Sequence, residues 1–154
     1  MPIVRCYVPL DAAQLTMLRD ARHLPGPLPA ATVTRTVREG APGADEEEWE
    51  YAAQQAAAAR LLAARAPVVL AAVDLVTELV DAERPDGAFV QVAHLDLPRV
   101  AALHLGDDVV TGDPDALAGT SADEEIELSW YDTTEIAHVV ELARALGGAT
   151  GPDA

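Results

Sequence analysis

The sequence predicts an α/β (α+β) fold in which helices pack on a mixed β-sheet of five to six strands. Segments with helical periodicity alternate with extended segments along the chain. The continuous apolar run 67–75 is typical of a strand that is buried on both faces of a sheet. Asp45 and Asp132 each precede a segment of helical periodicity, as residues that cap helix N-termini do.

Four elements are expected before residue 45. Residues 3–10 alternate and are rich in β-formers, so we expect a strand there. Asp11 then caps a helix that runs to about Leu24. The proline-rich segment 25–29 is expected to be a stiff connector. The β-branched residues of 31–37 predict a second strand.

The segment that begins at Asp45 predicts a helix. Asp45 and Glu48 match a capping box, in which each side chain pairs with the backbone N–H of the other residue. The neighbouring glutamates suit the positive end of the helix dipole. The expected buried face is rich in alanine, so that the helix can lie close to a sheet: Trp49, Ala52, Ala53, Ala56, Ala59 and Ala63.

The remaining elements follow the buried strand 67–75. Two extended arms around the turn sequence RPDG come next, then a strand at 99–105 and a short helix within 112–119. Residues 125–132 alternate, and the side chains expected to face inward are Ile126, Leu128 and Trp130. A last helix should end near Leu146 and bury Ile136, Val139, Val140, Ala143 and Leu146. We expect one α/β domain over 1–146 and a flexible C-terminal tail over 147–154.

The charge of the chain favours some partners and disfavours others. The 154 residues carry 26 acidic and 10 basic side chains, a net charge of -16, and every base is an arginine. A field this negative repels phosphate backbones and anionic membranes, and it attracts basic proteins and cations. We therefore expect no nucleic-acid partner and no membrane partner, and we consider a protein with a basic surface as the partner.

Several chemistries are excluded by missing residue types. Without lysine the chain has neither a P-loop lysine nor a Schiff-base lysine. No serine lies in a G-x-S-x-G motif, and no G-x-G-x-x-G follows a strand. Cys6 is the only cysteine, which suits a reducing cytoplasm, and its place in a predicted strand favours a buried structural thiol. The N-terminus lacks the architecture of a signal peptide.

Acids and histidines near strand ends are candidates for binding a metal or a small ligand. Asp74 closes the apolar strand, and an acid at the carboxyl end of a central strand is a common functional position. His94 and Asp96 end one strand, and His104 and Asp107 end the next. Two neighbouring antiparallel strands would place these two pairs at opposite ends. The competing interpretation is that the histidines are half-buried sheet residues and the aspartates form turns.

Acidic and aromatic residues together suggest a surface for a protein partner. Aromatic anchors with a charged rim mark protein interfaces, and two such segments occur, one at the start of the alanine-rich helix. The candidate residues are Glu46, Glu47, Trp49, Glu50, Tyr51 and Tyr131. The competing interpretation is that Trp49 and Trp130 are core residues beside a solvated helix start.

Four segments carry a family resemblance, in this order: RCYVPLDAAQLTML, DEEEWEYAAQQAAAA, RVAALHLGDD and ELSWYDTTEI. They resemble a family of small acidic actinobacterial proteins that is known only as a domain of unknown function. The resemblance covers nearly the whole chain and is most specific in EEEWEYAA and WYDTTEI. It implies a GC-rich actinobacterial source and a single α/β domain, and it carries over no catalytic residue and no ligand.

Three functions remain open from the sequence. The first is a cytoplasmic, non-enzymatic module, protein-binding or regulatory, that uses an acidic surface. The second is a small metal- or metabolite-binding protein, or a hydrolase-like enzyme, that uses aspartate and histidine at strand ends. The third is an acidic mimic of nucleic acid. We favour the first, lean against an enzyme, expect no cofactor and no metal, and expect a monomer or a homodimer.

Overall fold

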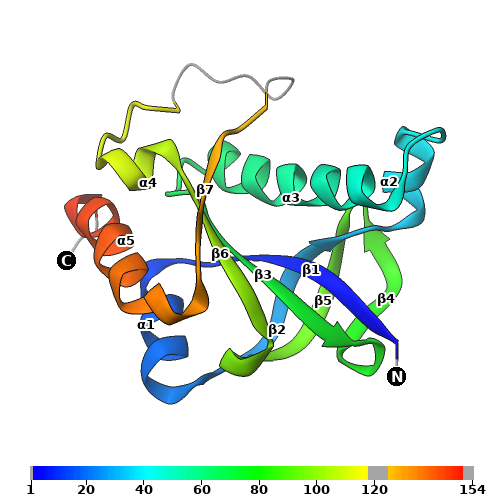
Figure 1. Cartoon of the computed structure of the whole chain (residues 1–154), viewed down its shortest axis with the longest axis horizontal. Coiled ribbons are helices and arrows are strands. Elements are labelled where there is room, and N and C mark those ends of the chain that lie inside the picture. Colours follow the sequence, from blue (N-terminus) through cyan, green and yellow to red (C-terminus); the bar gives the residue numbers. More distant parts are fainter. Residues whose placement is uncertain (1, 118–124, 151–154) are drawn as a thin grey trace.

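One β-sheet organises the fold (Figure 1). The computed structural model of the chain describes residues 2–117 and 125–150, with side chains up to residue 146. Within these residues the sheet has seven strands in the order β4-β5-β2-β1-β3-β6-β7. The strands are β1 (Ile3–Pro9), β2 (His23–Thr32), β3 (Val69–Val76), β4 (Val80–Asp86), β5 (Phe89–Asp96), β6 (Val100–Gly106) and β7 (Leu128–Tyr131). The helices are α1 (Ala12–Ala21), α2 (Arg35–Gly40), α3 (Glu46–Ala63), α4 (Asp107–Thr111) and α5 (Ile136–Thr150).

The α+β character is confirmed, but the sheet differs from the predicted mixed sheet of five to six strands. Every strand pairing in the described sheet is antiparallel. The links from β3 to β4, from β4 to β5 and from β5 to β6 are only a few residues long. Of these links, the one from β4 to β5 joins neighbours in the sheet, and its length suits an antiparallel pair because parallel neighbours need a crossover of a dozen residues or more.

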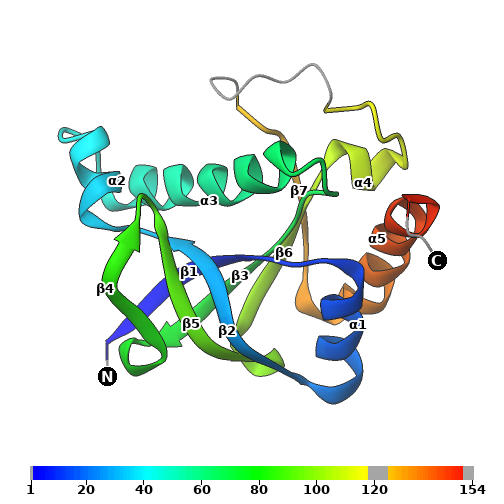
Figure 2. The same ribbon diagram turned by 180° about the vertical axis from the view of Figure 1, so that it is seen from behind.

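The two faces of the sheet are covered by different helices (Figures 1 and 2). α3 runs across one face, and α1 and α5 lie side by side on the other. The core under α1 and α5 is the larger one and consists mainly of leucine and valine. The core under α3 is rich in alanine: Ala31, Ala53, Ala57, Ala58, Ala72 and Ala102. None of the helices in the described part of the chain combines the length and the apolar character that crossing a bilayer requires.

Several predicted elements are confirmed. β1 matches the first predicted strand, and residues 68–73 of the apolar run are at most 1 % exposed, as expected of a strand buried on both faces. Asp45 accepts a hydrogen bond from the backbone N–H of Glu48 (2.9 Å), which is one half of the predicted capping box. The predicted inward face of α5 is buried at all five positions: Ile136, Val139, Val140, Ala143 and Leu146.

The predicted buried face of α3 is only partly right. The fully buried residues of this helix are Ala53, Ala57 and Ala58, whereas Ala52 and Ala63 are exposed. Since consecutive helical residues are 100° apart, the true face is rotated by a fraction of a turn from the predicted one. The alanine-rich contact with the sheet is confirmed.

The region between the first strand and the alanine-rich helix differs from the prediction. α1 ends at Ala21 rather than near Leu24, because the next residue adopts a left-handed conformation that ends the helix. β2 includes the predicted connector 25–29, whose register with β5 shifts between Pro25 and Leu28. This irregularity accommodates prolines that cannot donate to a regular ladder.

The predicted strand 31–37 is wrong beyond Thr32, where β2 ends. Thr34 lies in an extended conformation, and its hydroxyl accepts a hydrogen bond from the backbone N–H of Val37 (3.3 Å). The threonine therefore caps the N-terminus of α2. β-Branched residues suit a strand, but threonine also caps helices, and here the cap prevails.

The C-terminal elements differ in position. The short helix expected within 112–119 instead precedes that range, as α4, and Gly112 ends it with a φ of 73°. The last two residues of the predicted range lie outside the described residues. α5 continues to Thr150, beyond the expected end near Leu146. The division into one domain and a tail from residue 147 stays a prediction, and the last four residues of that tail lie outside the described residues.

Candidate functional site

A cleft of about 440 Å³ opens between α3 and the sheet edge formed by β6 and β7. Aromatic and acidic side chains give it its chemical character. They are Tyr51, His104, Asp107, Glu125, Glu127 and Trp130. Two large aromatic groups and three carboxylates therefore converge on one hollow.

A glutamine holds the segment before β7 against α3. The Gln55 side chain accepts a hydrogen bond from the backbone N–H of Ile126 (2.7 Å) and donates one to its carbonyl oxygen (2.9 Å). This two-point contact imitates the pairing of a neighbouring strand, and the Ile126 side chain is buried beside it. The flanking residues Glu125 and Glu127 are exposed on the rim of the cleft.

Trp130 was expected to face the core, and this prediction is wrong: its side chain is 61 % exposed. Two of the three inward residues agree with the prediction: Ile126 is buried, and Leu128 is partly buried against the core under α3. β7 is the edge strand, and α3 packs on β1, β2 and β3 instead. Trp130 therefore lies outside the main contact area of α3. It lies opposite His104 in the β6–β7 register, and Tyr51, 44 % exposed, is the second aromatic residue of the cleft.

His104 belongs to the lining of this cleft. Burial lowers the pKa of its imidazole, and the positive charge of Arg5 lowers it further, so the ring is neutral at neutral pH. Its ring centroid lies 6.5 Å from that of Tyr7, a phenol whose pKa is raised by burial. Partial burial also raises the pKa of Tyr51, and the carboxylate of Glu125 adds to this effect. The cleft thus offers neutral hydrogen-bonding groups beside carboxylates.

At the start of α3, which was predicted as an interaction surface, Trp49 makes intramolecular contacts and the glutamates are exposed. The indole N–H of Trp49 donates to the carbonyl of Ala41 (3.0 Å), and the Arg38 guanidinium lies 5.8 Å from its ring centroid. Trp49 therefore ties α2 to α3. Glu46 and Glu47 are exposed in the first turn of α3, away from the residues that line the cleft.

Tyr131 is separated from the other candidates of that surface. It follows Trp130 in β7, so its side chain points to the opposite face of the sheet. There it is partly buried against the core under α1 and α5, with its ring 5.9 Å from that of His138. Of the six predicted residues, Tyr51 is the one that lines the cleft.

Asp74 lies within β3 and not at its end, because the strand continues to Val76. Its carboxylate accepts two hydrogen bonds from Arg5, which is directly opposite in the β1–β3 register (2.7 and 3.0 Å). The pair raises the pKa of Arg5. Asp74 is therefore engaged in a cross-strand ion pair.

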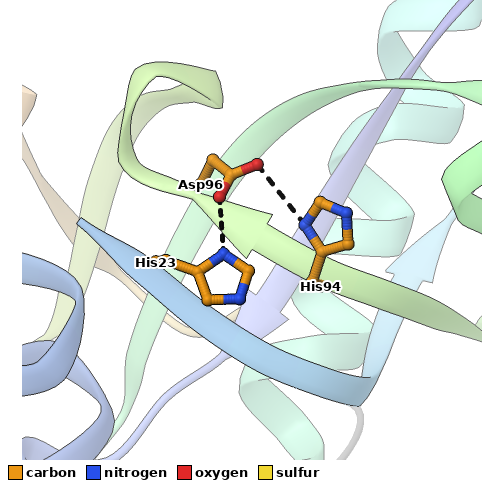
Figure 3. A group of neighbouring side chains, drawn as sticks. All are labelled: His23, His94 and Asp96. Atoms are coloured by element: carbon orange, nitrogen blue, oxygen red, sulfur yellow. Dashed lines mark hydrogen bonds and ion pairs between the residues drawn. The ribbon is translucent and has the colours of Figure 1, made fainter. Parts of the chain in front are cut away.

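The two histidine–aspartate pairs predicted as ligands lie apart. β5 carries His94 and Asp96, and β6 carries His104, but β2, β1 and β3 lie between these strands in the sheet. His104 and Asp107 belong to the cleft. His94 and Asp96 are joined by His23, which lies at the start of β2, the neighbour of β5 (Figure 3).

His23, His94 and Asp96 form a compact group on one face of the sheet. His23 Nδ1 lies 2.7 Å from Asp96 Oδ1, and His94 Nδ1 lies 3.4 Å from Asp96 Oδ2. The hydrogen bond with His23 holds the pKa of Asp96 below its usual value. No sequence pattern links His23 to the pair, because only the β2–β5 register brings them together.

The single cysteine is unsuited to catalysis. Cys6 is fully buried, and burial raises the pKa of its thiol to about 11. A thiol with this pKa carries almost no thiolate at neutral pH. The predicted structural role of Cys6 agrees with this environment.

A model of DUF6912, a family of unknown function, matches residues 4–140. No curated protein and no solved structure matches the chain. The matched range includes the described cleft and the group formed by His23, His94 and Asp96. The family resemblance expected from the sequence is confirmed, and its implied actinobacterial source stays a prediction. The chain thus belongs to the DUF6912 family, whose function is unknown.

Proposed function

We propose that the protein is a cytoplasmic, non-enzymatic binding module whose partner is a basic protein that inserts an arginine or lysine side chain into the cleft. One observation carries the proposal: exposed Trp130 and Tyr51 share a hollow of about 440 Å³ with the carboxylates of Asp107, Glu125 and Glu127. The buried thiol of Cys6 suits a reducing compartment.

The chemistry of the cleft matches a guanidinium group best. A cation over the face of tryptophan or tyrosine is attracted by about 0.5–2 kcal/mol, and arginine makes such contacts more often than lysine. Its planar N–H groups can donate to a carboxylate at the same time. Trp130 with Glu125 and Glu127 supplies both kinds of contact within one cleft.

The charge of the whole protein supports a basic partner. A net charge of -16 attracts cationic surfaces and speeds their encounter with the cleft. Attraction of this kind is screened by salt, so the affinity should fall as ionic strength rises.

A peptide titration tests the proposal. The probe is an acetylated hexapeptide of alternating arginine and glycine, and its control carries citrulline, which has the same shape and no charge. The fluorescence of Trp130 is followed in a Trp49→Phe variant, so that one tryptophan reports. We expect saturable binding of the arginine peptide, weakened by salt. Equal response to the citrulline peptide would contradict a cation site.

Matched charge variants separate the cleft from general attraction. Glu125→Gln with Glu127→Gln removes two charges from the cleft, and Glu46→Gln with Glu47→Gln removes the same number from the start of α3. The first pair should weaken binding about tenfold, the loss of about 1.4 kcal/mol of charged contacts. The second should change it by less than about twofold. If both pairs of substitutions weaken peptide binding equally, diffuse charge attraction and not the cleft binds the peptide.

A further inference from the structure

The register of two neighbouring strands gathers His23, His94 and Asp96 on one face. His23 is directly opposite Asp96, and His94 precedes Asp96 by two residues on the same strand. Leu24 and Leu95 alternate with them and are buried in the core under α1 and α5. The three polar side chains therefore lie on the face that α3 covers elsewhere, and they do not contribute to either core.

The backbone around the group is held firmly. The N–H of Leu97 donates to the carbonyl of Arg22 (3.1 Å), which joins the residues just outside His23 and Asp96. Between Pro25 and Leu28 the strand is irregular, and a Cβ on Gly26 would lie 2.1 Å from the carbonyl oxygen of Ala93. The two backbones thus meet closely beside His94, and such contacts fix the direction of nearby side chains.

The ligand atoms converge. The group offers one atom from each side chain, all within 4.8 Å of one another (Figure 3). The histidine nitrogens lie 2.7 and 3.4 Å from the two oxygens of Asp96. Ligand atoms that share a metal ion at 2.0–2.1 Å lie about 3 Å apart. Small side-chain adjustments would place a metal ion among all three.

His94 contributes a second observation at this group. Its Nδ1 atom is buried and makes no hydrogen bond within the described residues, although Asp96 Oδ2 is 3.4 Å away. A buried polar atom without a partner calls for an ion or a water molecule. Since Nδ1 faces the carboxylate, an ion that also binds Asp96 satisfies both groups.

The three side chains are of types that bind transition-metal ions. Neutral imidazole and ionised carboxylate are the states in which these side chains bind metals.

We propose that His23, His94 and Asp96 bind a divalent transition-metal ion of the zinc type. Two imidazoles and one carboxylate suit zinc and its neighbours rather than magnesium or calcium, which prefer oxygen. Three protein ligands leave at least one coordination position open to water or to a further ligand. Among the described residues this is the one group of three such side chains. It lies on β2 and β5, apart from the cleft at β6 and β7, so it does not depend on the proposed function.

Metal titration of the tag-free protein tests the proposal. Calorimetry with Zn²⁺ should give one ion per chain, and Zn²⁺ should raise the melting temperature because it binds the folded state. Co²⁺ should develop the visible absorption of a site with low coordination number, and Mg²⁺ should do neither. A folded protein that binds neither Zn²⁺ nor Co²⁺ would overturn the site.

Single substitutions assign the ligands. His23→Gln, His94→Gln and Asp96→Asn should each weaken Zn²⁺ binding by at least about tenfold and reduce the Co²⁺ absorption. His138→Gln, which removes an exposed imidazole of α5, is the matched control and should bind as the parent does. All four positions are exposed or half-buried, so circular dichroism should show an unchanged fold. Undiminished binding by His94→Gln, or loss of binding in the control, would refute the assignment.

Discussion

The two faces of the sheet are built differently. Under α1 and α5 the core is made of large aliphatic side chains, whereas under α3 it is made largely of alanine. Alanine lets the helix lie close to the sheet, and the main sheet contacts of α3 are with β1, β2 and β3. Both candidate sites lie on the α3 face, one on each side of the helix. The aliphatic face buries the larger side chains, and the alanine face leaves room for polar groups at its margins.

The largest expected effect is on the aliphatic face. Leu103 of β6 is fully buried there, and Leu103→Ala should lower the free energy of unfolding by about 2–5 kcal/mol through lost burial and a cavity. Urea denaturation measures the change. Met17→Ala on α1 is the control, because Met17 is 45 % exposed, and it should cost less than about 0.5 kcal/mol. If the two substitutions lower the free energy of unfolding by similar amounts, Leu103 is not a more important core residue than the exposed Met17.

On the alanine face the damaging change is a larger side chain. Ala57 is fully buried between α3 and the sheet, so Ala57→Leu should force the helix outward and cost about 1–3 kcal/mol. Ala52→Leu on the same helix places an equal side chain in solvent and should be nearly neutral. Thermal unfolding of the two variants compares them directly. If Ala57→Leu is also neutral, the packing of α3 is looser than described.

A smaller, pH-dependent effect is expected where α4 follows β6. Burial raises the pKa of Asp108, so folding favours its protonated form. Stability is therefore retained below the unfolded pKa of about 3.9 and lost as pH rises through the folded pKa. Asp108→Asn should raise the melting temperature near pH 7 and leave it unchanged well below pH 4. A variant less stable than the parent at about pH 7 would show that the carboxylate is stabilised by its backbone contacts.

The smallest effect concerns the polar pair on the α3 face. Arg5 and Asp74 form a bidentate ion pair whose side chains are 33 % and 41 % exposed. Partly exposed pairs contribute about 1 kcal/mol or less, and salt screens them. Asp74→Asn should lower the free energy of unfolding by that amount in dilute buffer and by less in about 1 M salt. If the substitution lowers the free energy of unfolding by several kcal/mol, the ion pair stabilises the fold as strongly as a buried core residue does.

Local patterns in the sequence predicted the elements whose surroundings are simple. The five inward residues of α5 and the Asp45 cap follow from helical geometry alone. The buried strand β3 follows from an uninterrupted apolar run. In each case the residues that decide the structure are neighbours in the chain, so no knowledge of the sheet order is needed.

Features that depend on the sheet order were not predictable. The partners His23 and Asp96 are 73 residues apart, and only the antiparallel pairing of β2 with β5 joins them, so the sequence predicted no metal. Trp130 alternates as a core residue but lies on an edge strand, outside the main contact area of α3, and is exposed. The position of a strand within the sheet decides both cases, and strand order is not encoded in any local pattern.

The position of β1 has a consequence for folding kinetics. This strand is the middle one of the described sheet and pairs with β3, so that Arg5 meets a partner 69 residues further along the chain. During synthesis β1 leaves the ribosome long before β3 does. A sheet whose central pairing is this distant in sequence has a high contact order, and domains of that kind fold in milliseconds to seconds rather than microseconds. Until then one edge of β1 lacks its partner, and unpaired strand edges of this kind favour association with other chains.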